Sequence, residues 1–405
     1  MQRRNFLKHL SVFPTLSLIE SLRANEDELK KNGKSAILLW MGGGPSTMDI
    51  WDLKPGAPTG GPFKSIGTSG DVQICEHMPL MAKQMHNAAI IRSMSTREAD
   101  HMRGRYYMHT GYVPNPSMTH PSYGSVISHQ LQRPEVSIPK FISVGGGSMG
   151  AGFLGAKYSP FVVNSDGRIR NLDIKVDQRF YQRAYALDAI ETGFINQRRG
   201  SVAKEHQAIL KEAFGVLTSS QMDALKVAGE PDNVKERYGE NGFGKGCLMA
   251  RRLVEAGVPF IEVNLGGWDN HQNIHPMLRD TKLPMLDQGM SALFEDLEQR
   301  GLIDDTVVIW MGEFSRTPRI NQNAGRDHWA RSWSVVVGGG GMNGGIAVGS
   351  TNSDGTRVET EPHTSQDVMA SVCKALGISL GTTFTSNNGR PMKIANSGKV
   401  IKELF

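Results

Sequence analysis

Short, continuous runs of apolar residues alternate along the chain with longer segments in which apolar residues recur at helical spacing. Glycine, proline or polar residues bound the short runs, which is typical of strands buried on both faces of a sheet. We expect six such strands, at residues 36–41, 88–94, 139–144, 258–265, 306–311 and 333–337. We expect five helices, at residues 177–197, 202–214, 244–256, 284–300 and 365–376. The alternation predicts an α/β fold in which helices sandwich a mostly parallel central sheet.

Residues 31–405 are predicted to form a single domain, because no internal repeat, low-complexity tract or linker divides them. Residues 165–240 are richer in charge and in helical pattern than the rest, and we interpret them as a helical insertion or a lid over the sheet. Gly257 lies between a predicted helix and a predicted strand, where a helix C-cap would stand.

The N-terminus has the features of a targeting segment, so residues 1–30 are left out of the fold prediction. Arg3-Arg4-Asn5-Phe6-Leu7-Lys8 resembles the twin-arginine export motif, and a modest apolar stretch follows at residues 10–19. An amphipathic helix that happens to begin with two arginines is the alternative. Agreement at six consecutive positions favours export, and we predict a periplasmic or otherwise exported protein whose partner is the twin-arginine export machinery.

Composition narrows the class of protein. The chain is 39% hydrophobic and 21% charged, which is typical of a globular protein. Its formal charge is +5, but no basic stripe interleaved with aromatic residues occurs, so we expect no nucleic-acid partner. No apolar run approaches the roughly 20 residues of a membrane span, so none is predicted. The three cysteines are far apart and match no metal-binding or redox spacing.

Acidic residues and histidines gather beside the ends of the predicted strands, where ligands bind in open α/β sheets. Five segments carry them: Asp49 and Asp52 after the first strand, His101 with Arg105 after the second, Asp269 and His271 after strand 258–265, Glu313 with Arg316 after strand 306–311, and Asp327 and His328 before strand 333–337.

Each of these segments alone is better explained as turn chemistry or a satisfied polar group. Together they predict a metal site, because carboxylates that cluster without a cation repel one another. Mixed imidazole and carboxylate ligands suit zinc, manganese or iron better than calcium. We expect one or two divalent ions, with zinc or manganese favoured. Arg105, Arg316 and Arg326 are either partners for an anionic group or members of surface ion pairs, and the sequence leaves both interpretations open.

Five ordered motifs resemble the bacterial family called domain of unknown function 1501. They are GGGPSTMDIWDLKP at residues 42–55, HTGY at 109–112, GGWDNH at 266–271, GEFSRTP at 312–318 and GRDHW at 325–329, and the resemblance runs from about residue 35 to the end. The family is similar to a branch of the alkaline phosphatase and sulfatase clan. The resemblance implies an alkaline phosphatase-like fold and a metal-dependent phosphatase- or sulfatase-like activity.

The resemblance also implies metal ligands. Asp269, His271 and His328 match one metal site of the clan in order, whereas Asp49 and Glu313 are the nearest matches to a second site. Asp327 is expected either to bind the ion or to orient His328. The chain departs from the clan at Gly43 and Gly44, where a carboxylate is usual, and at Glu313-Phe314, where an Asp-His pair is usual.

The expected nucleophile departs most. In sulfatases a cysteine motif precedes a helix that ends in Thr-Gly-Arg, and counting back from His109-Thr-Gly-Tyr112 places His101 at the nucleophile position. His101 is predicted to be a metal ligand first, with a nucleophile or a general acid as alternatives. Ser95 and Thr96 are outside candidates for the nucleophile, and Cys247 is rejected because it lies inside a predicted helix.

The sequence therefore predicts an exported metal-dependent hydrolase that acts on a phosphate or sulfate ester, with His101, Arg105 and Arg316 as its catalytic residues. The substrate would be an anionic ester, with a polysaccharide or another surface polymer as a candidate. The alternative is a degenerate clan member that binds a metal and a ligand without turnover. A structural envelope protein without metal is a third hypothesis, which the density of acidic residues and histidines at strand ends disfavours.

Overall fold

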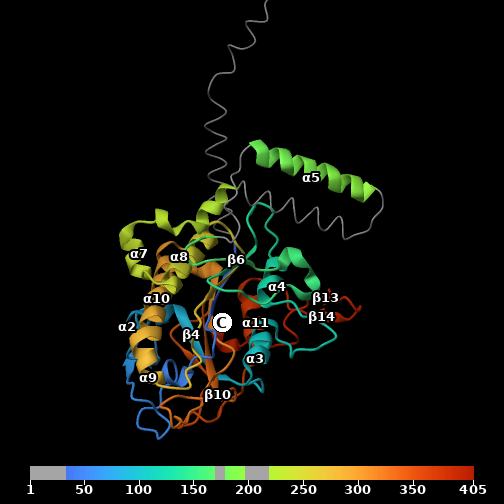
Figure 1. The fold of residues 1–405 in the computed structure, drawn as a ribbon. Helices are drawn as coiled ribbons and strands as arrows, with labels where there is room; N and C mark the ends of the chain where they lie inside the picture. Colours follow the sequence, from blue (N-terminus) through green and yellow to red (C-terminus); the bar gives the residue numbers. More distant parts are fainter. Residues whose placement is uncertain (1–32, 169–177, 197–218) are drawn as a thin grey trace, which may run out of the picture. The chain divides into compact units, whose positions relative to one another are not determined.

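The computed structural model describes residues 33–168, 178–196 and 219–405 (Figure 1). The predicted export segment at residues 1–30 and the predicted helix at residues 202–214 lie outside the described residues. Among the described helices, none is long and apolar enough to cross a membrane.

An eight-stranded sheet forms the centre, with strand order β12-β4-β11-β8-β1-β7-β5-β6. Its strands are β1 (Ser35–Trp40), β4 (Ala88–Met94), β5 (Phe141–Val144), β6 (Phe161–Val163), β7 (Phe260–Asn264), β8 (Thr306–Met311), β11 (Trp333–Gly339) and β12 (Ala347–Val348). All six predicted strands are present, with ends shifted by two residues at most. The predicted α/β class with a mostly parallel sheet is confirmed.

β11 is the one strand of this described sheet that runs antiparallel to its neighbours, β4 and β8. The chain between β8 and β11 contains a two-stranded hairpin, β9 (Ser315–Arg316) with β10 (His328–Trp329), and no crossover helix. A parallel neighbour requires a crossover across one face of the sheet, so a chain that makes only a hairpin returns in the opposite direction.

Helices cover both faces of the sheet (Figure 1). The described α-helices are α2 (Pro79–Ala82), α3 (His101–Thr110), α4 (Tyr123–Gln130), α5 (Gln178–Asn196), α7 (Asp232–Tyr238), α8 (Gly242–Glu255), α9 (Ile274–Met277), α10 (Leu283–Gln299) and α11 (Ser365–Ala375). A π-helical segment, Leu278–Lys282, joins α9 to α10.

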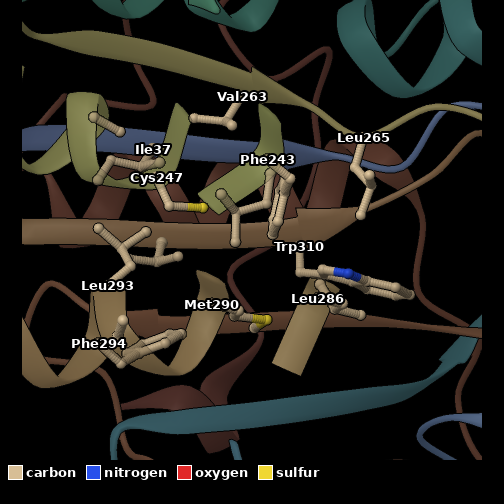
Figure 2. Close-up of a cluster of buried hydrophobic side chains, with 14 of the residues drawn as sticks. Ile37, Phe243, Cys247, Val263, Leu265, Leu286, Met290, Leu293, Phe294 and Trp310 are labelled. Carbon is tan, nitrogen blue, oxygen red and sulfur yellow. The ribbon is translucent and has the colours of Figure 1, made fainter. Parts of the chain in front are cut away.

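Alternate residues of β1 enter two separate hydrophobic cores, as the period of two in a strand requires. Ile37 and Leu39 pack with α8 and α10, whereas Leu38 and Trp40 pack with α3, α4 and α11. Figure 2 shows the first core, in which Cys247 lies among the apolar side chains between the helices and the sheet. Cys75, Cys247 and Cys373 are all buried free thiols.

Gly257 terminates α8 in the way the sequence predicts. Its φ is +86°, its N–H donates to Val254 O at 2.9 Å, and the N–H of Val258 donates to Leu253 O at 2.9 Å. These two bonds form a Schellman motif, which satisfies carbonyl groups at the helix end and turns the chain into β7.

We expect Gly257→Ala to lower the free energy of unfolding by about 1–2 kcal/mol, because an L-residue at positive φ brings its Cβ against the backbone. The added Cβ would also lie 3.0 Å from Val136 Cγ2. Denaturant unfolding measures the change. Gly229→Ala is the matched control, since Gly229 is exposed and a Cβ there meets open space. Equal effects of the two substitutions would contradict the role assigned to Gly257.

Candidate metal centre

The loops that follow β8, β1 and β7 meet at one edge of the sheet, because these three parallel strands are neighbours. Glu313 follows β8, and its Oε1 accepts a hydrogen bond of 2.9 Å from the N–H of Gly43, which follows β1. Asp269 follows β7 and lies against the same turn, since a Cβ on Gly43 would stand 2.6 Å from Asp269 N. The glycines after β1 therefore allow the other two loops to approach.

The β9–β10 hairpin brings two further polar side chains, His328 and Arg316, to this edge. His328 pairs with Arg316 in its register, so residues twelve apart in sequence become neighbours. Arg316 is 1% exposed. It donates from Nε to Gly44 O at 2.8 Å and from Nη2 to Gly43 O, which fixes its guanidinium beneath the turn after β1.

Helix α3 supplies His101 from its first turn. The helix begins there because the side chain of Asp100 accepts a hydrogen bond of 3.0 Å from the N–H of Arg103, as an N-cap does. Gly104 lets the helix approach the loop after β8, since a Cβ there would lie 3.1 Å from the Phe314 ring and 3.2 Å from Glu313 O. His101 thereby reaches the loops after β7 and β8.

Three imidazoles converge on one carboxylate oxygen. The Nε2 atoms of the three histidines stand at 3.3 Å (His101), 2.9 Å (His271) and 3.3 Å (His328) from Asp269 Oδ1. Ligand atoms of His101, Asp269 and His328 all lie within 4.8 Å of one another. Such a set of two imidazoles and a carboxylate fits a divalent transition metal.

The other ring nitrogen of each histidine faces a hydrogen-bond acceptor. Nδ1 of His101 lies 2.6 Å from Glu313 Oε1, Nδ1 of His271 lies 2.8 Å from Asp327 Oδ1, and Nδ1 of His328 lies 2.9 Å from Ala99 O. A carboxylate or carbonyl oxygen only accepts, and Asp269 Oδ1 is an acceptor too, so a neutral ring can donate to one side alone. With its proton on Nδ1, each ring would direct an Nε2 lone pair toward Asp269, as a metal-binding histidine does.

Charge and burial shift the pKa values of these groups in different directions. Burial raises the pKa of Asp269, but the charge and hydrogen bond of Arg316, whose Nη2 lies 2.5 Å away, outweigh it and lower the pKa to about 2. Burial lowers the pKa of His328. The hydrogen bond with Glu313 raises the pKa of His101, although burial acts against it.

Asp49 lies in a different set of contacts. It is 2% exposed, and both of its oxygens are bound by the fully buried guanidinium of Arg326, at 2.8 and 2.9 Å. His275 Nε2 lies 3.2 Å from Asp49 Oδ1. The structure thus places Asp49 and Arg326 in a buried ion pair, apart from the oxygen of Asp269 on which the three histidines converge.

The remaining predicted residues lie around the centre in supporting positions. Glu313 and Asp327 bind the Nδ1 atoms of histidines rather than joining the three-residue group. Arg105 donates to Gly147 O, and no contact joins its side chain to the described metal-binding groups. Sequence reasoning missed the Ala99 carbonyl and His275, and a backbone carbonyl leaves no signal in a sequence. His275 could have been found from its spacing, since it lies four residues after His271.

The profile of the family described as Protein of unknown function (DUF1501) matches residues 33–405. The chain belongs to this family. The resemblance predicted from the five motifs is thereby confirmed, and the matched range includes every residue of the centre. No curated protein matches the chain.

Several solved structures are similar to this member of the family. Ps i-CgsB is 10% identical, with 91% of this chain and 75% of that chain covered and a TM-score of 0.44. A protein in the alkaline phosphatase superfamily from Vibrio parahaemolyticus is 13% identical, with 91% and 69% covered and a TM-score of 0.40. A mutant of the alkaline phosphatase from the Antarctic bacterium TAB5, with Mg bound, is 13% identical, with 86% and 99% covered and a TM-score of 0.37.

We expect the stability of this family member to depend on Asp49 in a pH-dependent way. Burial raises the pKa of Asp49, but the hydrogen bond from His275 and the charge of Arg326 outweigh it and hold the pKa below its ordinary value. Its contribution is therefore fully present above the unfolded-state pKa of about 3.9 and is lost as pH falls through the lower folded-state value. Asp49→Asn should cost about 3–5 kcal/mol at neutral pH, because it leaves Arg326 buried without its counter-charge.

Unfolding free energies of wild type and Asp49→Asn, measured from pH 7 downward, test this expectation. The difference between them should narrow below about pH 4. Asp71→Asn is the control, since Asp71 is exposed and its side chain has no hydrogen bond or ion pair with a described residue. A difference for Asp49→Asn that stays constant across this range would refute the role of its ionised carboxylate.

Proposed function

We propose that this protein is an exported metal-dependent hydrolase of phosphate or sulfate esters. Export follows from the twin-arginine-type motif at residues 3–8, and the chemistry follows from the centre at the edge of the sheet. The substrate class is an anionic ester, and a polysaccharide or other surface polymer bearing such esters is the natural substrate of an exported enzyme.

The observation that carries the proposal is the convergence of three Nε2 atoms on Asp269 Oδ1. With the ring protons on Nδ1, three lone pairs would face an anionic oxygen, which is unfavourable, and the Nε2 of His101 is buried without a hydrogen-bond partner among the described residues. A divalent cation between His101, Asp269 and His328 resolves this conflict. The donor set supports one ion, with zinc or manganese favoured by its mixture of imidazole and carboxylate.

The bound ion and the surrounding side chains would each have a separate role in the reaction. A bound divalent ion would supply a Lewis acid for an ester oxygen. Arg316 holds a fixed positive charge beside the same carboxylate, where it favours an anionic substrate and the charge that develops on its oxygens. His271 is tied through Nδ1 to Asp327 and presents Nε2 to the centre, which is the arrangement of a general base for a water molecule.

A protein without turnover is the second candidate, and one observation favours it. No serine, threonine or cysteine side chain forms a hydrogen bond with His101, Asp269, His271 or His328 among the described residues. Ser95 and Thr96 instead use their backbone N–H groups to bind His363 O and Ala330 O. Hydrolysis would then require direct attack by water, whereas a binding protein would need no nucleophile.

We expect the purified full chain to bind about one zinc or manganese ion, because one group of three ligands is present. His328→Ala should weaken binding at least about ten-fold, since it removes a ligand. Elemental analysis gives the stoichiometry and isothermal titration calorimetry gives the affinity. His86→Ala is the matched control, because His86 is an exposed histidine that bonds to Glu298. A folded wild-type protein that binds neither metal would refute the proposal.

We expect the metal-loaded protein to hydrolyse at least one of four model compounds: aryl phosphate or sulfate monoesters or diesters. A chelator should abolish the activity, and His271→Ala should lower kcat by about 10²–10⁴-fold through loss of the general base. Circular dichroism establishes that the variant keeps its fold, and His86→Ala again serves as control. A loaded protein that binds these esters without hydrolysing any of them would favour the binding protein.

A further inference from the structure

The Asp49 carboxylate joins three loops of the chain beneath the metal centre. Its Oδ2 accepts from Ser46 Oγ at 2.6 Å and Arg326 Nε at 2.8 Å, and its Oδ1 accepts from Arg326 Nη2 at 2.9 Å and lies 3.2 Å from His275 Nε2. Each carboxylate oxygen offers about two lone-pair positions, so these four donor atoms fill all of them. Asp49 therefore has no capacity left for a metal ion.

The guanidinium N–H groups of Arg326 are likewise all bound by acceptors. Besides both oxygens of Asp49, its guanidinium donates to the backbone carbonyls of Thr317, Pro318 and Thr59, and its side chain is fully buried. Arginine is suited to this task because its planar fork binds a carboxylate through two parallel bonds while its remaining donors reach other acceptors. The contacts fix both ends of the loop at residues 317–326 against the turn after β1.

Two of the residues that bind Asp49 are close in sequence to residues of the centre. Arg326 lies two residues before His328, and His275 lies four residues after His271. The N–H of Arg326 also donates to Asn270 O at 3.2 Å, immediately after Asp269. One buried carboxylate thus holds the loop that carries Asp269 and the loop that carries His328.

The same two loops are in direct contact. Gly325 packs on the backbone of His271 so closely that a Cβ there would lie 2.0 Å from His271 C. Asn321 donates to His271 O at 3.1 Å and to Asp327 Oδ1 at 3.2 Å. The distance between Asp269 and His328 is therefore set by packing that the Asp49–Arg326 pair anchors.

We propose that Asp49 and Arg326 are positioning residues that set the metal affinity of the centre without touching the ion. The inference rests on the proposed metal site of His101, Asp269 and His328. Ligand atoms must be held to within about 0.5 Å of their productive places for tight binding. Two loops that lose a shared anchor will sample a wider range of separations between Asp269 and His328. Metal binding must then also fix the two loops, and the conformational entropy lost in doing so lowers the affinity.

Titration of Zn²⁺ into wild type, Asp49→Asn and Arg326→Lys by calorimetry tests the inference, together with thermal unfolding with and without Zn²⁺. Both variants should bind Zn²⁺ about ten-fold more weakly, as variants of residues that orient ligands do. The increase in Tm that Zn²⁺ causes should shrink in both. A purely structural ion pair would lower the Tm of the metal-free protein and leave that increase unchanged.

Arg251→Lys is the matched control. Arg251 is 2% exposed and bonds to Glu230 at 2.7 Å and Glu255 at 2.8 Å, so the substitution disturbs the ion pairs of another buried arginine, whose partners lie outside the ligand loops. It should lower the Tm and leave Zn²⁺ affinity unchanged. If Asp49→Asn and Arg326→Lys do not fold, His275→Ala removes a single bond from Asp49 and should weaken Zn²⁺ binding in the same direction.

The outcomes separate this inference from the function on which it rests. A wild-type protein that does not bind Zn²⁺ rejects the metal centre and the positioning role together. Wild-type binding with unchanged affinity in the variants rejects the positioning role alone. An equal loss of affinity in Arg251→Lys rejects it too, because the loss then follows from general destabilisation. Weaker binding confined to the variants of Asp49, Arg326 or His275 supports it.

Discussion

The contact between three imidazoles and one carboxylate oxygen is the constraint on which the rest of the structure depends. His101, His271 and His328 come from different segments, and each directs Nε2 at Asp269 Oδ1. The convergence requires that every Nδ1 be held by its own acceptor, because a ring free to rotate would turn toward water. The loops after β4, β7 and β8 are therefore shaped as much by Glu313, Asp327 and Ala99 O as by the ligands themselves.

Close approach of these loops accounts for the glycines at the strand ends. Gly43 and Gly44 have φ values of +113° and +68°, and a Cβ on Gly44 would lie 2.8 Å from the Phe314 ring. The turn after β1 can therefore direct two carbonyl groups at Arg316, which in turn faces Asp269. This turn thus has a definite use: its backbone, rather than a side chain, binds the arginine of the centre.

Much of the fold could be predicted from sequence, because buried parallel strands and amphipathic helices carry their own periodicity. The predicted strand ends also indicated where the acidic residues and histidines of a site would lie. His101, Asp269 and His328 were among the residues predicted in this way. What the sequence could not show is which carboxylate faces which partner. Asp49 and Asp269 both follow buried strands, yet Arg326 encloses one and three histidines face the other. Arg326 is 277 positions from Asp49 and His328 is 59 positions from Asp269, and local sequence pattern contains no record of such pairings.

Arg316 has two opposing effects on the binding of a cation at Asp269. Its positive charge keeps Asp269 ionised, with a pKa of about 2, and so preserves the carboxylate that a metal requires. The same charge lies 2.5 Å from Oδ1 and opposes a cation at that oxygen. Because Arg316 is buried and bound to Gly43 O and Gly44 O, it cannot move away easily when an ion arrives. Metal affinity would then depend on well-placed imidazoles, and so on the proposed anchoring of the ligand loops by Asp49 and Arg326.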